Sequence, residues 1–177
     1  PRRNRISNCE GRLPGRMNKQ KQQNLLKFIF FLSILGIVLS GYLTYIHYST
    51  LSSPCDFSET FQCSLVNQSK YAEVFGIPVA LLGMMGYSFL GLVSLVLLKR
   101  KFLSKVRANK FLGKLVSVQT LFVFSIIALI VSLYLTYAEF FLIKAICIWC
   151  LISQIIILVI VGFSYKILKL NKLVEGD

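Results

Sequence analysis

Four long apolar stretches dominate the pattern of hydrophobic and polar positions along the chain. They run approximately over residues 25–48, 74–98, 115–137 and 145–165, and polar segments separate them. The central part of each stretch holds no Asp, Glu, Lys or Arg. A helix needs roughly 20 residues to cross the hydrocarbon core of a bilayer, and charge is costly there. The pattern therefore predicts an all-α membrane protein, a bundle of four transmembrane helices.

The connection between the first two stretches is the longest one on its side of the membrane. Residues 64–73 read as a short amphipathic helix, which we expect to lie along the membrane surface as a lid. Gly76 and Pro78 mark the entry to the second span, with Pro78 in the first helical turn. In the first span Gly36, Ser40 and Gly41 are small residues that allow close helix approach.

The chain reads as one membrane domain over residues 25–170 between two polar tails. We expect residues 1–24 to form a disordered cytoplasmic tail, of which residues 1–16 are a candidate non-native extension, and residues 171–177 to form the second cytoplasmic tail. Cys9 lies in the first tail, and we expect no role for it.

Composition and charge then orient the bundle. The chain is 55% hydrophobic with a mean hydropathy of +0.68, which suits lipid as the solvent, and its net charge is +13. Basic residues gather before the first span, after the fourth, and between the second and third. The charged residues of the first loop, in contrast, are mainly acidic. Because basic residues cluster on the cytoplasmic side, both termini should be cytoplasmic in the cell (inner) membrane. The charge does not indicate a nucleic-acid partner, since no basic and aromatic platform accompanies it.

This orientation places four of the five cysteines on the exoplasmic side. Cys55 and Cys63 fall in the first loop, and Cys147 and Cys150 fall at the start of the fourth span. Disulfides form and persist in that compartment and seldom in the cytosol. Disulfide chemistry is therefore open to all four.

Cys147–Ile148–Trp149–Cys150 is a C-x-x-C motif at the start of a helix. Residues three apart share one helix face, and the rise between them is about 4.5 Å, within disulfide reach. Free N–H groups and the helix dipole stabilise a thiolate there, while apolar burial opposes it. The outer Cys147 could exchange with a loop disulfide, and the deeper Cys150 could meet a membrane-soluble molecule.

Three other interpretations of the cysteines stay open from the residues alone. The C-x-x-C motif can be a coincidence of small core residues. The four cysteines can bind zinc, although the Cys55–Cys63 spacing exceeds that of the usual zinc knuckle. They can also form two purely structural disulfides. Only a thiol–disulfide relay uses the placement of C-x-x-C at a helix end.

The combined order of these motifs resembles the vitamin K epoxide reductase (VKOR) family in its prokaryotic, disulfide-generating form. The resemblance covers roughly residues 25–165. It rests on Cys55, Cys63–Ser64, Ser69–Lys70–Tyr71–Ala72, Phe75–Gly76–Ile77–Pro78 and the C-x-x-C motif, together with Gly41–Tyr42–Leu43–Thr44–Tyr45 and Tyr134–Leu135–Thr136–Tyr137.

The resemblance implies a four-helix bundle around a quinone, either ubiquinone or menaquinone. It implies that Cys147 and Cys150 are the active-site pair, with Cys150 reacting with the quinone, and that Cys55 and Cys63 are a shuttle pair. The electrons would come from a thioredoxin-fold (DsbA-like) protein. Because only about a dozen residues follow the fourth span, we expect that partner to be a separate protein.

The resemblance also implies a quinone pocket, for which we expect Phe75, Gln154, Tyr137 and Ala72. Animal members of the family carry an Asn and a Tyr where this chain has Ala72 and Gln154, a difference that disfavours vitamin K epoxide as the substrate. The amide of Gln154 could still bond a quinone oxygen. We expect His47 to be an interfacial residue and Glu139 to be solvated just outside the third span.

Overall fold

The computed structural model describes residues 13–49, 53–56, 58, 60–74, 76–99 and 116–175, with side chains from residue 20 to residue 171. Cys9, Phe75 and the basic residues from Arg100 to Lys114 lie outside the described residues, as do residues 1–12 of the predicted tail.

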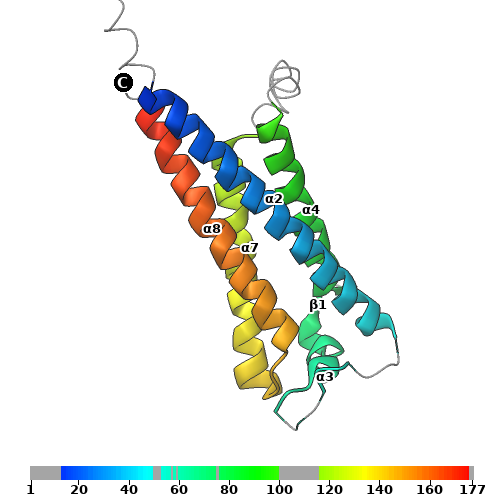
Figure 1. Ribbon diagram of the computed structural model, residues 1–177. Helices are drawn as coiled ribbons and strands as arrows, with labels where there is room; N and C mark the ends of the chain where they lie inside the picture. Colours follow the sequence, from blue (N-terminus) through cyan, green and yellow to red (C-terminus); the bar gives the residue numbers. More distant parts are fainter. Residues whose placement is uncertain are drawn as a thin grey trace, which may run out of the picture.

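Four long helices form the bundle: α2 (Leu13–Tyr48), α4 (Val79–Leu98), α7 (Val118–Tyr137) and α8 (Ile148–Glu175). Helix α2 packs along α4 and α8, and α7 packs along α8 and, less extensively, α4 (Figure 1). Each of the four is long and apolar enough to cross a membrane. The chain is therefore an all-α, multi-pass membrane protein, as its hydrophobic pattern predicts.

The first and last helices extend further than the apolar stretches that we used to predict them. Helix α2 begins at Leu13, so residues 13–24 are helical instead of belonging to a disordered tail, and α8 continues to Glu175. Lys and Gln, which are frequent between residues 18 and 24, are good helix formers. The apolar pattern marks the thickness of the bilayer, and it does not mark where such a helix ends.

A β-hairpin replaces the predicted beginning of the second span. Strands β1 (Glu73–Val74) and β2 (Ile77–Pro78) pair antiparallel, and α4 begins only at Val79. Gly76, in the turn, has a φ of 76°, a conformation that glycine adopts without steric cost. Pro78 ends β2 and precedes the helix, so it is not in the first helical turn as we expected. The predicted amphipathic segment forms two short pieces, α3 (Cys63–Asn67) and the 3-10 helix η1 (Lys70–Ala72).

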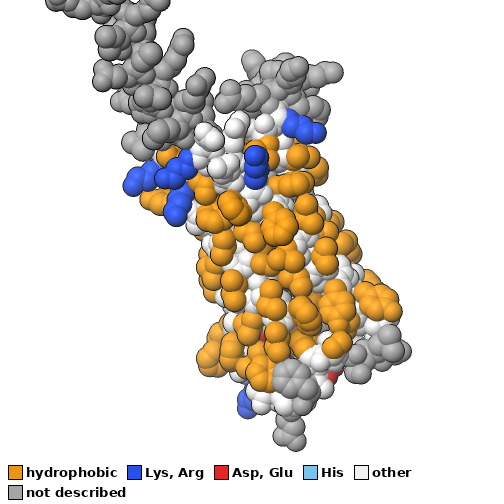
Figure 2. Space-filling view, viewed as in Figure 1, with side chains coloured by type: hydrophobic (Ala, Val, Ile, Leu, Met, Phe, Trp, Pro, Cys, Tyr) orange, Lys and Arg blue, Asp and Glu red, His pale blue; other side chains and the backbone are white. Residues whose placement is uncertain are grey.

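Charge separates the two ends of the bundle. Most lysine and arginine side chains visible in Figure 2 gather near the end where α2 begins and α8 finishes, and hydrophobic side chains cover the surface between the ends. The exposed hydrophobic residues include Phe31, Leu92, Ile130 and Ile155. Such a surface suits contact with lipid chains. The loop that carries Cys55 and Cys63 lies at the opposite end of the bundle (Figure 1).

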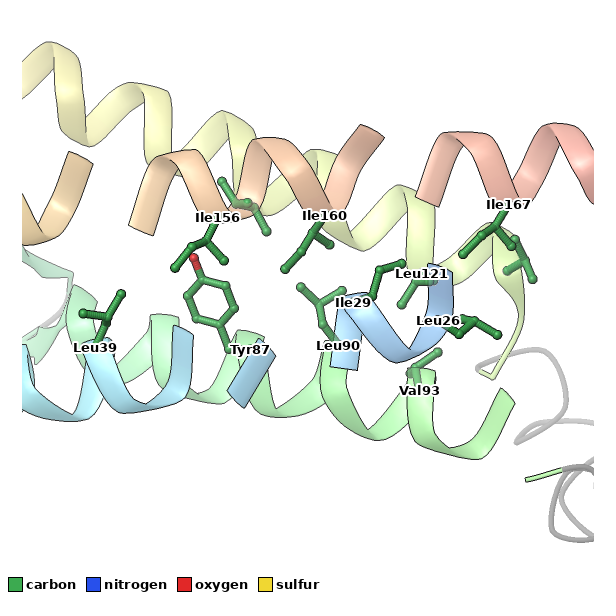
Figure 3. Packing of buried hydrophobic residues seen from close by; sticks show 12 residues of the cluster. Leu26, Ile29, Leu39, Tyr87, Leu90, Val93, Leu121, Ile156, Ile160 and Ile167 are labelled. Carbon is green, nitrogen blue, oxygen red and sulfur yellow. The ribbon is translucent and has the colours of Figure 1, made fainter. Parts of the chain in front are cut away.

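The core of the bundle combines branched apolar side chains with one close helix contact. Ile29, Leu90, Leu121 and Ile160 are almost fully buried between the helices (Figure 3). The ring of Tyr87 on α4 lies against Gly36 on α2, so closely that a Cβ atom on Gly36 would lie 2.5 Å from the ring. The prediction that small residues of the first span allow close approach is confirmed for Gly36. The Tyr87 hydroxyl reaches α8 and donates to the Ser153 carbonyl oxygen at 2.9 Å.

Candidate active site

A disulfide joins Cys55 and Cys63 at the end of the bundle away from the termini. Their Cα atoms are 5.9 Å apart, within the usual range for a disulfide. The carboxylate of Asp56 organises the turn between them by accepting hydrogen bonds from the backbone N–H groups of Ser53 and Ser64 and from the Ser64 hydroxyl. Burial raises the pKa of Asp56, but these hydrogen bonds from Ser64 and Ser53 outweigh it, and the pKa is lowered overall.

The same loop is attached to the segment that precedes α8. The backbone N–H of Ile146 donates to the carbonyl oxygen of Thr60 at 2.9 Å, and Phe61 pairs with Ile146 as an isolated parallel bridge. Each of these residues is within three positions of a cysteine of the site. The pairing therefore holds the loop disulfide beside Cys147.

Asn67 fastens the other side of the loop to α2. Its side-chain Nδ2 donates to the carbonyl oxygen of Leu43 at 2.6 Å, and its own carbonyl oxygen lies 2.7 Å from Nδ1 of His47. The other ring nitrogen of His47 lies 3.3 Å from the carboxylate of the exposed Glu73. His47 is thus an anchor for α3, a role that we did not expect from its place at a span end, and Asn67 was not singled out in the sequence at all.

Cys147 occupies the N-cap position of α8, and Cys150 is in the first turn. The Cys147 sulfur accepts the backbone N–H of Cys150 at 3.3 Å, as a capping side chain does, and it lies 2.7 Å from the Cys150 sulfur, whose S–H donates to it. The Cys147 carbonyl oxygen accepts the N–H of Leu151, which is the first helical hydrogen bond. Both cysteines are free thiols. The helix-end placement predicted for the motif is confirmed.

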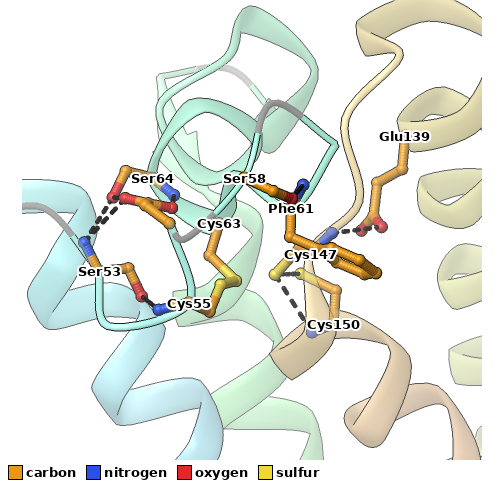
Figure 4. The surroundings of a disulfide bond; sticks show 10 residues. Ser53, Cys55, Ser58, Phe61, Cys63, Ser64, Glu139, Cys147 and Cys150 are labelled. Atoms are coloured by element: carbon orange, nitrogen blue, oxygen red, sulfur yellow. Dashed lines mark hydrogen bonds between the residues drawn. A yellow bond between two sulfur atoms is a disulfide. The ribbon is translucent and has the colours of Figure 1, made fainter.

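The two cysteine pairs share one buried cluster. Cys55, Cys63 and Cys147 are 5%, 0% and 0% exposed, and they pack together with Leu43, Val66 and Ala145. Cys150 is partly buried and packs against this cluster. Figure 4 shows the disulfide, Cys147 and Cys150 following one another across the end of the bundle. This order allows thiol–disulfide exchange from the loop pair to Cys147, and from Cys147 to Cys150.

Glu139 is the functional candidate that sequence reasoning missed. We expected a solvated residue, but Glu139 is 2% exposed. The end of the third span continues as a π-helix, η2 (Ala138–Ile143), and Glu139 is one of its buried residues. Its Oε2 accepts the backbone N–H of Cys147 at 3.2 Å. The available signal was a carboxylate two positions beyond the end of a predicted span, because ionisable groups within the membrane are usually functional.

The thiols also bear on the zinc interpretation. A carboxylate oxygen of Glu139 and the sulfurs of Cys147 and Cys150 lie within 4.8 Å of one another, close enough to share an ion. Cys55 and Cys63 are bonded to each other, so they cannot serve as thiolate ligands in this arrangement. A site made of the four cysteines therefore does not fit the structure.

The residues predicted for the quinone pocket lie in different settings. Gln154 lies one helical turn below Cys150 on the same face of α8, and its Oε1 accepts a hydrogen bond from Thr136 on α7. Tyr137 is 54% exposed and stacks on Phe141 with ring centroids 4.8 Å apart. Ala72 is half-buried at the end of η1, and Phe75 lies outside the described residues. The pocket as a whole stays a prediction.

The N–H groups of Trp149 and Gln154 lie near Cys150 in the sequence of α8 and suit the carbonyl oxygens of a quinone. Among the described residues, only two buried polar side-chain atoms lack a hydrogen-bond partner, Trp149 Nε1 and Ser164 Oγ. Trp149 lies between Cys147 and Cys150 in sequence, and its ring packs edge-on against that of Tyr42 with centroids 5.6 Å apart. The Gln154 amide, whose oxygen is engaged by Thr136, can direct its N–H groups elsewhere. N–H donors that face no acceptor fit a ligand whose polar atoms are acceptors only.

Comparison with known proteins agrees with the geometry. A search of curated proteins finds no match. The family model described as "Vitamin K epoxide reductase family" matches residues 27–165, which include most of each long helix and both cysteine pairs. The chain belongs to the vitamin K epoxide reductase family, whose members are membrane oxidoreductases that act on thiols, disulfides and quinones.

Proposed function

We propose that this protein oxidises a thioredoxin-fold partner and passes the electrons through two cysteine pairs to a membrane quinone, and so sustains disulfide formation. The observation that carries the proposal is the shared cluster in which the Cys55–Cys63 disulfide packs against the buried Cys147. A structural disulfide needs no free thiol beside it. A relay needs one within reach of exchange.

The chemistry proceeds in three balanced steps. Two thiolates of the reduced partner reduce the Cys55–Cys63 disulfide, first through a mixed disulfide, and the partner leaves oxidised. A loop thiol then attacks Cys147 of the Cys147–Cys150 disulfide, so that the loop disulfide forms again and the helix pair becomes two thiols. That product has an oxidised loop pair beside two thiols at Cys147 and Cys150. Cys147 and Cys150 finally return to the disulfide as they lose two electrons and two protons.

A quinone, when bound, supplies the two-electron oxidant for the last step. Gln154 and Trp149 would hold its oxygens through their N–H groups, since both lie within five residues of Cys150 on α8. The hydrophobic surface of the bundle suits delivery of a lipid-soluble molecule through the bilayer.

We also propose that the cysteine end faces the exoplasmic side of the inner membrane. The basic side chains of the opposite end support this orientation, because basic residues cluster on the cytoplasmic side. A membrane-impermeant maleimide applied to intact cells should label a cysteine introduced at Ser58 and not one introduced at Lys169. The reverse result would invert the topology.

The central experiment uses purified protein, reduced thioredoxin as the partner, and a short-chain ubiquinone or menaquinone. Wild-type protein should oxidise thioredoxin and reduce the quinone in equal amounts. Cys150→Ala should abolish quinone reduction, and Cys9→Ala is the matched control, which should retain it. Turnover that persists in Cys150→Ala would contradict the relay. No turnover in any form would favour a scaffold with structural disulfides.

A second variant separates the two cysteine pairs. Cys55→Ala should stop oxidation of thioredoxin while dithiothreitol still drives quinone reduction through Cys147 and Cys150. If Cys55→Ala leaves thioredoxin oxidation intact, the loop pair is not the entry point. Reduction of vitamin K epoxide at a rate similar to that of quinone would instead favour the alternative role of the family, vitamin K recycling.

A further inference from the structure

Glu139 is a buried carboxylate beside the thiols of Cys147 and Cys150. It is 2% exposed, it belongs to a helix that crosses the membrane, and one of its oxygens already accepts the N–H of Cys147. A carboxylate oxygen and the sulfurs of Cys147 and Cys150 lie within 4.8 Å of one another. Capping the start of α8 needs only a hydrogen-bond acceptor, which an uncharged Gln or Asn also provides. Burying a carboxylate in a membrane costs more free energy than burying an amide, which indicates that the charge or the proton affinity of Glu139 is used.

The thiol chemistry supplies that reason. Oxidation of two thiols to a disulfide releases two protons together with two electrons, and reduction of a quinone to a quinol takes up the same number of each. The described titratable side chains facing Glu139 are the two thiols themselves, from the segment before α8 and from its first turn. Cys147 and Glu139 are both cut off from water. Protons released in this place need a carrier among the side chains.

We propose that Glu139 carries the proton of the Cys150 thiol during the redox step, an inference that rests on the proposed quinone reductase function. The S–H bond of Cys150 breaks and an O–H bond forms on Glu139, which leaves a thiolate and a neutral carboxylic acid. The disulfide then forms as two electrons leave the pair for the quinone. The proton on Glu139 follows to one quinol oxygen, the Cys147 thiol proton goes to the other, and the carboxylate is regenerated.

Glu139→Gln tests this role because it keeps an acceptor for the Cys147 N–H while it removes the negative charge and the ability to take up a proton. The substitution should affect the rate of quinone reduction and the rate of Cys150 alkylation differently. With dithiothreitol as reductant and a short-chain ubiquinone as acceptor, kcat should fall about 10²-fold or more, the usual size of general acid–base catalysis. Alkylation of Cys150 by iodoacetamide at neutral pH should stay equal or become faster, because the loss of a neighbouring negative charge favours the thiolate.

Glu73→Gln is the matched control, since Glu73 is 44% exposed and dithiothreitol bypasses the loop near which it lies. It should leave both rates within about twofold of the wild type. A kcat for Glu139→Gln within twofold of the wild type would overturn the proposal. So would a parallel fall of kcat and alkylation, which is the result expected for a purely structural acceptor.

Time-resolved infrared spectroscopy of the wild-type protein can follow the carboxyl group during a single oxidation of the Cys147 and Cys150 thiols by the quinone. The carbonyl band of a protonated carboxylic acid should appear and decay, the band should shift in D₂O, and Glu139→Gln should lack it. The absence of any carboxyl change in the wild type would contradict proton transfer to Glu139 even if the variant does not fold. Wild-type protein that fails to reduce any quinone would count against the proposed function, whereas normal wild-type turnover without these effects would count against Glu139 alone.

Discussion

The two halves of the bundle are held together by different means. Near the termini, branched side chains such as Ile29 and Ile160 fill the space between helices, and the close contact of Gly36 with Tyr87 joins α2 to α4. At the cysteine end a covalently closed loop rests on the helices, and polar anchors such as Asn67 and the Thr60–Ile146 hydrogen bond hold it. The tightly packed side chains near the termini leave little room for residues of a different size. The loop at the cysteine end has to stay in place while its disulfide bonds exchange.

The comparison predicts that mutations in the two halves will affect different measurements. Changes in the apolar half should lower the stability of the bundle and leave thiol exchange intact in the folded protein. Changes at the cysteine end should alter exchange with the partner and leave the melting of the bundle almost unchanged. Four predictions follow this division, from the largest expected effect to the smallest.

Gly36→Ala should cause the largest loss of stability. The added Cβ would lie 2.5 Å from the Tyr87 ring, so the helices must separate or the ring must move, and overpacking of this kind costs about 1–3 kcal/mol. Gly162→Ala is the matched control, because a Cβ there meets no atom within 4 Å. Thermal melting in detergent should separate the two variants. Equal melting temperatures would show that the α2–α4 contact does not limit stability.

Asn67→Ala should uncouple the loop from α2. The variant loses the hydrogen bond that the Asn67 side chain donates to the Leu43 carbonyl oxygen, at a cost of about 0.5–1.5 kcal/mol that falls on the loop. Thioredoxin oxidation should slow several-fold, while dithiothreitol-driven quinone reduction should continue at its normal rate. Gln68→Ala, at the neighbouring exposed amide, is the control. A loss of both activities would show that Asn67 supports the Cys147–Cys150 pair directly.

These two predictions also show how far the sequence could lead. Gly36 was visible as a small residue within an apolar span, because helix packing leaves a local pattern in the chain. The anchors and Glu139 were not visible, because each depends on a contact between segments that are far apart in sequence or on a local change of winding. Asn67 reaches across 24 residues to Leu43, and Glu139 is buried in the π-helix with which the third span ends.

The same distinction explains the corrections to the fold. Hydrophobicity predicted four spans, since the bilayer imposes that pattern residue by residue. It placed the second helix five residues too early, because the segment that contains β1 and β2 is apolar enough to continue the span, while Gly76 and Pro78 instead form a hairpin. The order of the cysteines along the chain predicted a common site. The packing of Cys63 against Cys147 depends on the Thr60–Ile146 pairing, which nothing in the local sequence indicates.

Tyr87→Phe should have a moderate effect confined to the apolar half. The Tyr87 hydroxyl contacts both the carbonyl oxygen and the hydroxyl of Ser153, at 2.9 and 2.8 Å, and a hydrogen bond of this kind contributes about 1 kcal/mol. A double-mutant cycle with Ser153→Ala, followed by thermal melting, isolates the contact between the two hydroxyls. Additive effects would indicate that this contact contributes nothing beyond the bond to the carbonyl oxygen. Quinone reduction should not change in either single variant.

Asp56 provides the smallest and most local test, through pH. Burial opposes its negative charge, but hydrogen bonds from Ser64 and Ser53 lower its pKa in the folded loop. Because the folded pKa lies below the unfolded one, the contribution of Asp56 is complete above the usual carboxyl range and is lost as the pH falls through the lowered pKa. The Cys55–Cys63 disulfide should therefore become easier for an acid-tolerant phosphine to reduce only under distinctly acidic conditions, and Asp56→Asn should lose this dependence. A pH dependence that persists in Asp56→Asn would place the acid-sensitive group elsewhere. The melting temperature of the apolar half should stay constant over the same pH range, so that pH alone would separate the two halves of the bundle.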